Sequence, residues 1–250
     1  MVLSLVPAIL GVLITVLLAA GATLSRALTP LAGAVAAVFG SIIVVTVGFP
    51  FLALMVLFVV GSVVATRYQF DQKKRSNVQE GRAGERGVSN VLAHILIPTG
   101  LALITTFDAG LVSASEFAVL YSAALAFGAS DTFASEFGVL SQGARSILTF
   151  RKVVAGTNGG VTAYGEAWAF VGAGTTALIA FGLILLARLP SPGIAIFLLA
   201  VIAAGFLGCQ VDSVLGEVLE NRGFLTKHST NFGSMLISVL IAGTIVRVVG

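Results

Sequence analysis

The chain has 250 residues, of which 57% are hydrophobic and only 10% are charged. A water-soluble domain carries about a quarter charged residues, so this composition excludes a soluble protein and indicates an integral membrane protein. The net charge of +3 does not by itself indicate nucleic-acid binding, because the position of basic residues in a membrane protein matters more than their sum.

Eight apolar segments are candidates for membrane-crossing helices, since one crossing takes about 20 residues. Long runs of Leu, Val and Ala, with many Gly and few Tyr, favour helices over the strands of a barrel. The block 31–66 is too long for one crossing, and Gly48 and Pro50 divide it in two. The expected spans are 3–23, 31–48, 50–66, 89–107, 113–130, 165–188, 193–211 and 232–249. We therefore predict an all-α membrane protein of about eight transmembrane helices (seven being possible), forming a single polytopic domain over 1–250.

The basic residues predict which side of the membrane each connection occupies. With eight spans, Arg26 and three long connections fall on one face; these connections are 67–88, 131–164 and 212–231. Of the 14 Lys and Arg residues, only Arg188 and Arg247 lie opposite. The positive-inside rule then makes the basic face cytoplasmic. Because no basic residue precedes the first apolar segment, we expect a retained helix there rather than a cleaved signal.

Two segments repeat one pattern of acids. Both DTFASE (131–136) and DSVLGE (212–217) read Asp, Ser or Thr, two apolar residues, a small residue and Glu. The similarity continues from LTFRKVVAGTNGG (148–160) to LTKHSTNFG (225–233). Two spans separate the copies, so they have the same orientation, and parallel repeats in membrane proteins often place a site at their interface. We expect leading helices in 1–60 and a catalytic region of hairpin repeats in 61–250.

The repeated acids are candidate metal ligands. Asp131, Glu136, Asp212 and Glu217 are expected at one depth near the basic face. Mg²⁺ prefers oxygen ligands and binds phosphates alongside one or two carboxylates. Five residues turn a helix by about 140°, so the two acids of a pair do not share one face. Either one acid of each pair supports a metal ligand without binding the metal itself, or the helix breaks there. The alternative, that these acids only cap helices or pair with Arg, is less favoured, because ionisable residues within spans are usually functional.

A glycine-rich segment and a basic loop are candidate phosphate sites. In AGTNGGVTAYG (155–165) the glycines free the backbone just before an expected helix, where amide groups can cradle an anion. Lys152 lies just upstream, although a simple turn before a span explains this pattern equally well. The basic loop 67–88 either binds a triphosphate or serves only as a topology signal; Lys73, Arg82 and Arg86 are its strongest candidates.

At ASDTFASEFGVLS, RKVVAGTNGGVTAYG and QVDSVLG, the chain resembles the integral-membrane family that includes plant phytyl-phosphate kinase. The resemblance covers about residues 60–235. It implies a kinase that uses CTP or another nucleotide, with Mg²⁺, to convert an isoprenyl monophosphate of the phytyl or geranylgeranyl type to the diphosphate. It also implies kinship with dolichol and phytol kinases and with membrane cytidylyltransferases, and a site on the cytoplasmic face of what we expect to be the plasma membrane.

The resemblance assigns a role to each motif residue. The implied catalytic residues are Asp131, Glu136, Asp212 and Lys152. The implied nucleotide-binding residues are Lys73, Asn77, Arg82, Arg86, Asn90, Gly156, Thr157, Asn158, Gly159 and Gly160. The implied metal ligands are Asp131, Glu136, Asp212 and Glu217.

Two other functions fit the same features. A transporter of a cation or organic anion suits parallel repeats with acids, although carriers usually place such residues near the middle of the membrane. A lipid cytidylyltransferase shares the metal and CTP but releases pyrophosphate. The expected partners are a lipid substrate, a nucleotide and the bilayer, without nucleic acid, and the oligomeric state stays open.

Overall fold

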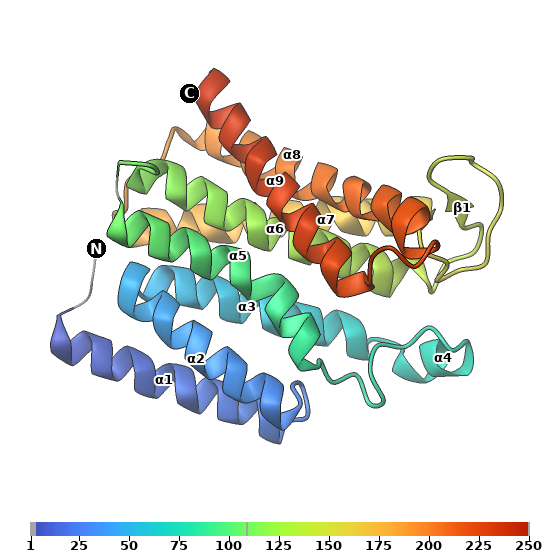
Figure 1. Ribbon diagram of the computed structural model, residues 1–250, viewed down its shortest axis with the longest axis horizontal. Helices are drawn as coiled ribbons and strands as arrows, with labels where there is room; N and C mark the ends of the chain where they lie inside the picture. The colour runs from blue at the N-terminus through green and yellow to red at the C-terminus, as the bar shows by residue number, and fades with distance from the viewer. Residues whose placement is uncertain (1–3, 109, 250) are drawn as a thin grey trace.

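The computed structural model describes residues 4–108 and 110–249, and its long helices run side by side in one bundle (Figure 1). The helices are α1 (Leu5–Leu24), α2 (Pro30–Val47), α3 (Phe49–Arg67), α4 (Phe70–Arg75), α5 (Val88–Phe107), α6 (Ala114–Gly138), α7 (Ala163–Leu186), α8 (Ile194–Leu215) and α9 (Lys227–Val249). A π-helical segment, η1 (Gly216–Glu220), continues α8, and a two-stranded hairpin of β1 (Arg145–Ser146) and β2 (Gly160–Val161) precedes α7. Within the described residues, eight helices are long and apolar enough to cross a membrane, which confirms the predicted fold class.

The break between α2 and α3 lies where the sequence predicts it. Gly48 has a φ of +93°, a conformation that L side chains rarely adopt, and it separates Val47 from Phe49. Pro50 lies in the first turn of α3, where its missing N–H would have no helical partner in any case.

Three spans are longer than predicted by several residues, and one of them, expected to begin at residue 232, begins as α9 at Lys227. The span expected to end at residue 130 continues as α6 to Gly138, and the one expected to end at 211 continues as α8 to Leu215 and then as η1. The rest of the protein buries 83% of an 18-residue window of α6, and in its last turns Thr132, Glu136, Phe137 and Gly138 are buried. Both repeated acid motifs therefore lie on helices.

Helix α6 is the centre of the bundle, and it contacts α3, α5, α7, α8 and α9. Small residues allow the helices to approach closely. A Cβ atom added to Gly172 of α7 would lie 2.7 Å from the carbonyl oxygen of Ala129, and one added to Gly205 of α8 would lie 2.8 Å from the Cβ of Ala126. Across the first contact, the Ser130 hydroxyl donates a hydrogen bond of 2.6 Å to the carbonyl oxygen of Ala169.

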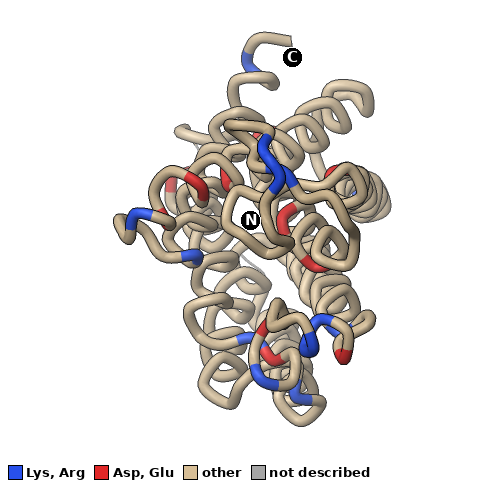
Figure 2. The backbone as a smooth tube through the Cα atoms, turned by 90° about the vertical axis from the view of Figure 1, so that its right-hand side faces the viewer, with Lys and Arg blue, Asp and Glu red and all other residues tan. Residues whose placement is uncertain are grey.

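The polar connections gather at one end of the bundle. α4 and the β1–β2 hairpin extend beyond the long helices at the same end, while α1 begins and α9 finishes at the other (Figure 1). Seen from the end with α4 and the hairpin, most charged residues lie on the loops and helix ends toward the viewer (Figure 2). We call this end the polar end.

Candidate functional site

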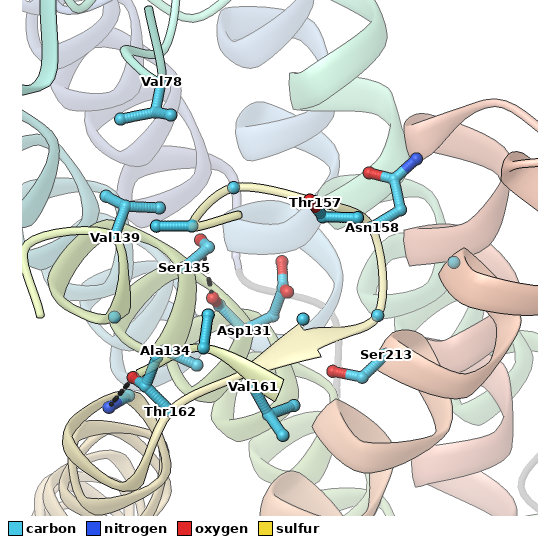
Figure 3. A pocket seen from close by; sticks show the side chains of 18 of the residues that line it. Val78, Asp131, Ala134, Ser135, Val139, Thr157, Asn158, Val161, Thr162 and Ser213 are labelled. Carbon is cyan, nitrogen blue, oxygen red and sulfur yellow. Dashed lines mark hydrogen bonds between the residues drawn. The ribbon is translucent and has the colours of Figure 1, made fainter. Parts of the chain in front are cut away.

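Asp131 of α6 and Asp212 of α8 line one cavity of about 250 Å³ at the polar end. In the close-up view the Asp131 side chain projects into this cavity, and the segment with Thr157 and Asn158 arches over it (Figure 3). Glu80, Glu166 and Glu220 add further carboxylates to the wall, with Lys227 as a cation. We call this space the acidic pocket. The first acids of the two repeated motifs thus meet in space, 81 positions apart in the chain.

The two aspartates have different hydrogen-bonding environments. The Asn231 side chain donates a hydrogen bond of 3.2 Å from Nδ2 to Oδ2 of Asp131. The Oδ1 atom of Asp212 is buried and accepts no hydrogen bond from any residue that the structure describes. A buried carboxylate oxygen without a donor carries a large desolvation cost, so this atom is positioned for a ligand that the protein itself does not supply.

The β1–β2 hairpin encloses the glycine-rich segment and closes one side of the acidic pocket. Arg145 pairs with Val161 and Ser146 with Gly160, so the chain leaves and returns at the same place. Thr162 caps α7, because its hydroxyl accepts a hydrogen bond of 2.9 Å from the Gly165 amide. The helix expected near residues 161–166 therefore begins at Ala163.

Two amide groups in this segment are available to a ligand. The N–H groups of Asn158 and Gly159 have no hydrogen-bond acceptor among the residues that the structure describes. Gly159 has a φ of +76°, and a Cβ there would collide with Glu217. Only glycine lets the backbone lie this close to η1 with these amides exposed, and unpaired amides before a helix N-terminus favour an anion.

Glu217 holds the hairpin and does not line the acidic pocket. Its carboxylate accepts hydrogen bonds from the Ser146 hydroxyl (2.7 Å) and from the Leu148 amide (3.4 Å). Glu217 lies on the π-helical segment η1, and such segments are common at functional sites. Glu217, predicted as a metal ligand, uses its carboxylate in the structure to bind the hairpin to η1.

The two repeats exchange contacts across the acidic pocket. Asn231, from the second Thr-Asn pair, binds Asp131 of the first acid motif. Gly159, next to the first Thr-Asn pair, packs against Ser213 and Glu217 of the second acid motif. Each glycine- or asparagine-bearing segment therefore meets the acid motif of the other copy, as the sequence comparison of parallel repeats suggests.

Glu136 belongs to a buried ion cluster at the edge of the acidic pocket. Its Oε2 atom accepts from the Lys73 ammonium at 2.7 Å, and its Oε1 atom accepts from the Thr66 hydroxyl at 2.7 Å. Lys73 is 1% exposed and also donates to the carbonyl oxygen of Ala65. Both carboxylate oxygens thus accept hydrogen bonds from protein groups, and Glu136, predicted as a metal ligand, is the counter-ion of Lys73 in the structure.

Arg86 and Asn90 lie on the far side of this cluster. The Arg86 guanidinium donates from Nη2 to the Thr66 hydroxyl (3.2 Å) and from Nη1 to Oδ1 of Asn90 (3.0 Å). Burial lowers the pKa of Arg86, although Glu80, Glu136 and Asp131 oppose this effect. The guanidinium is still a cation, because arginine side chains do not lose their proton in proteins. Neither residue lines the acidic pocket, so the structure does not bring them to the glycine-rich segment.

The remaining candidate residues divide between the pocket and the surface. Asn77, Gly156, Thr157, Asn158, Gly159 and Gly160 line the acidic pocket. Lys152 and Arg82 are exposed and do not line it. Among the described residues, no three His, Cys, Asp or Glu side chains come together as a metal site, so the four repeated acids do not share one centre.

Sequence reasoning missed Lys227 and Glu80 as pocket residues. Lys227 pairs with Glu80 at 3.1 Å across the pocket wall. Burial raises the pKa of Glu80, but the charge and hydrogen bond of Lys227 outweigh it and hold this pKa below its ordinary value. The repeat contained the signal, because Lys227 occupies the position of Lys152 in the second copy. Only the tertiary structure decides that Lys227 lines the pocket and that Lys152 does not.

The acidic pocket fits a divalent cation carried in with phosphates. Mg²⁺ at phosphate sites usually takes one or two protein carboxylates and keeps its other positions for phosphate and water. Asp131 and Asp212 supply that number, and the unpartnered Oδ1 atom of Asp212 is an open oxygen donor. Among the described residues that line the pocket, Lys227 is the one cation, so the wall is acidic overall.

Comparison with known proteins agrees with this architecture. Residues 13–243 match the family model described as integral membrane protein DUF92. An uncharacterized membrane protein of Methanocaldococcus jannaschii is 31% identical over 83% of this chain and 79% of its own. Protein PGR of Arabidopsis thaliana is 32% identical over 81% and 76%, and an uncharacterized membrane protein of Synechocystis is 31% identical over 87% and 82%. No solved structure matches the chain. The chain belongs to the DUF92 family of integral membrane proteins.

Proposed function

We propose that this protein is a membrane kinase that transfers a phosphoryl group from a nucleotide, CTP in the first instance, to an isoprenyl monophosphate. The observation that carries the proposal is the meeting of Asp131 and Asp212 in one pocket beneath a glycine-rich anion cradle. Acids with an adjacent anion cradle suit a nucleotide bound together with a divalent cation. The pocket lies at the end of the bundle where a lipid head group and a soluble nucleotide can meet.

Different residues of the acidic pocket would bind the nucleotide phosphates and the metal ion. The free amides of Asn158 and Gly159 would hold phosphate oxygens of the nucleotide, and the dipole of α7 favours the negative charge there. Asp131 and Asp212 would hold Mg²⁺, which neutralises charge on the transferring phosphoryl group. Asn231 fixes the orientation of Asp131, and Glu217 holds the hairpin closed over the pocket.

The reaction itself demands little of the protein. An oxygen of the lipid phosphate forms the new bond to the γ-phosphorus of the nucleotide, while the bond to the bridging oxygen breaks and the nucleoside diphosphate leaves. The attacking phosphate is already largely ionised at neutral pH, so no strong general base is required. Phosphoryl transfer of this kind depends on positioning and charge stabilisation rather than on covalent chemistry.

Product analysis tests the proposal. Purified protein is incubated with Mg²⁺, nucleotide labelled at the γ-phosphate and a panel of prenyl monophosphates, beside the Asp212→Asn variant as control. A kinase gives a labelled lipid diphosphate and an unlabelled nucleoside diphosphate, with neither product from the variant. A CDP-lipid with released pyrophosphate would establish a cytidylyltransferase instead, and no nucleotide turnover with any prenyl phosphate contradicts the kinase. The proposed location, with the pocket at the cytoplasmic face of the plasma membrane, is tested separately by labelling loop cysteines from each side.

A further inference from the structure

A second cavity of about 440 Å³ lies between α1, α2, α3 and α5, away from the acidic pocket. Its wall is almost entirely apolar and includes Leu52, Met55, Val59 and Val63 of α3. The volume falls within the range of ligand sites in proteins, about 300 to 1,000 Å³. We call this space the apolar cavity.

The apolar cavity is long and follows the helices toward the polar end. Its lining on α1 extends from Thr15 to Ser25, and its lining on α3 extends from Leu52 to Val64. At 1.5 Å per residue these stretches are about 15 to 18 Å long. The cavity therefore follows most of α3 and reaches the level of the loops, and its length is comparable to that of a hydrocarbon chain in one leaflet of a membrane, about 15 Å.

Polar groups without partners lie toward its loop end. The Nε atom of Arg86, the Nε2 atom of His94 and the Oγ atom of Ser62 are buried, and none has a hydrogen-bond partner among the described residues. All three residues line the apolar cavity, and they are 7%, 4% and 1% exposed. Buried polar atoms are nearly always satisfied in native proteins, so three of them in one cavity indicate a ligand with a polar head.

The charge of the neighbouring cluster specifies the sign of that head. Lys73 and Arg86 are two cations, and Glu136 is the carboxylate that bonds to this cluster. Glu136 lies 2.7 Å from Lys73, whereas Arg86 is in no ion pair within 4 Å in the described parts of the chain. A buried guanidinium without a counter-ion is costly, and an oxyanion is the group that guanidinium binds best.

We infer that the apolar cavity binds a single-chain lipid whose acidic head group lies against Arg86 and whose hydrocarbon chain lies along α3. Asn90 and Thr66 each take one donor, on Nη1 and Nη2 of Arg86, and leave its Nε–H without a partner at the wall of the cavity. Thr66 also bonds to Glu136, which lines the acidic pocket, so two hydrogen bonds join the head-group site to that pocket. The assignment of this lipid as the acceptor of phosphoryl transfer rests on the proposed function. The binding of the lipid in the apolar cavity does not depend on that function.

Photolabelling tests the inference without requiring turnover. The probe is hexadecyl phosphate carrying a diazirine near its chain end, compared with the matching hexadecanol and with inorganic phosphate as competitor, in detergent-purified full-length protein. Val63→Trp fills the cavity, and Val171→Trp on the exposed face of α7 is the matched control. We expect labelled peptides from α1 and α3 and at least a 10-fold loss of labelling in Val63→Trp, with Val171→Trp unchanged.

The head group is tested with Arg86→Gln. This variant should weaken labelling by the phosphate probe at least 10-fold and labelling by the alcohol much less. Competition by inorganic phosphate alone would reassign Arg86 to a free anion and overturn the lipid assignment. Equal labelling of both tryptophan variants would show only bulk lipid on the surface and would also overturn it. If the wild-type protein is labelled but turns over no nucleotide, the proposed function is contradicted and the lipid site is still supported. The Asp212→Asn variant should retain labelling whether or not the wild-type protein is active.

Discussion

Asn231 and Asp131 are 100 positions apart in the chain, and a 3.2 Å hydrogen bond joins them in the acidic pocket. Asn231 belongs to the second repeat and Asp131 to the first, so the hydrogen bond forms only when the two repeats are packed together. It leaves the Oδ1 atom of Asn231 without a partner among the described residues and the Asp131 side chain projecting into the pocket (Figure 3). The repeat interface, rather than either repeat alone, makes the site.

Asp131→Asn and Asp212→Asn should each abolish activity while the protein still folds. Asparagine keeps the shape of aspartate but removes the charge that would hold a magnesium-bound nucleotide. The expected fall in kcat/KM is at least about 100-fold, as for the loss of other electrostatic groups in active sites. Turnover of nucleotide is measured beside size-exclusion chromatography of the purified variants. Near-normal turnover in both well-folded proteins would remove these acids from the reaction.

Gly159→Ala should impair nucleotide use more than Gly223→Ala. Both residues have a φ near +75°, so both changes place alanine in a strained backbone conformation. Only at position 159 does the new Cβ meet Glu217, whereas nothing lies within 4 Å of it at position 223. We expect a fall of about 10- to 100-fold in kcat/KM for nucleotide in the first variant, because the hairpin is displaced. Similar kinetics in the two variants would mean that the close approach to η1 is not needed.

Lys73→Met should destabilise the protein strongly. It leaves the Glu136 carboxylate buried without its cation, and breaking a buried pair of this kind costs about 3 to 5 kcal/mol. Arg247→Met is the control, since Arg247 pairs with Glu116 at an exposed position where such a pair contributes about 1 kcal/mol or less. Urea unfolding in detergent measures both. The double variant Lys73→Met, Glu136→Met should recover part of the loss, and equal losses from Lys73→Met and Arg247→Met would contradict the assignment.

The Glu80–Lys227 pair should make stability depend on pH in acid. The pKa of Glu80 lies below its ordinary value in the folded protein, so its contribution is fully present above the pKa of the unfolded chain, about 4.3. That contribution is lost as the pH falls through the lower, folded pKa. In thermal melts from pH 6.5 to pH 3.5, the difference in Tm between the wild-type protein and Glu80→Gln should therefore become smaller below about pH 4.3. A difference in Tm that is constant over this range would contradict a stabilising ion pair between Glu80 and Lys227.

The amino-acid sequence alone determined the class of the protein and the location of its chemistry along the chain. Low charge and eight apolar runs specify a helical membrane bundle, because each crossing must satisfy its own backbone hydrogen bonds. Gly48 and Pro50 fixed the break between α2 and α3, since local backbone preference does not depend on distant residues. The repeated motifs around Asp131 and Asp212 indicated the candidate site, because a repeat is visible in the order of residues along the chain.

Only the tertiary structure decided which side chains of those motifs act together. Asp131 and Glu136 lie on one helix, yet five residues of helical rotation direct one into the acidic pocket and the other toward Lys73. Which partner each meets depends on how α3 and α8 pack against α6, and side-chain spacing along one helix does not contain that information. The same holds for Lys227, which lines the acidic pocket although Lys152 does not, and for Arg86, which lines an apolar cavity between α1, α2, α3 and α5.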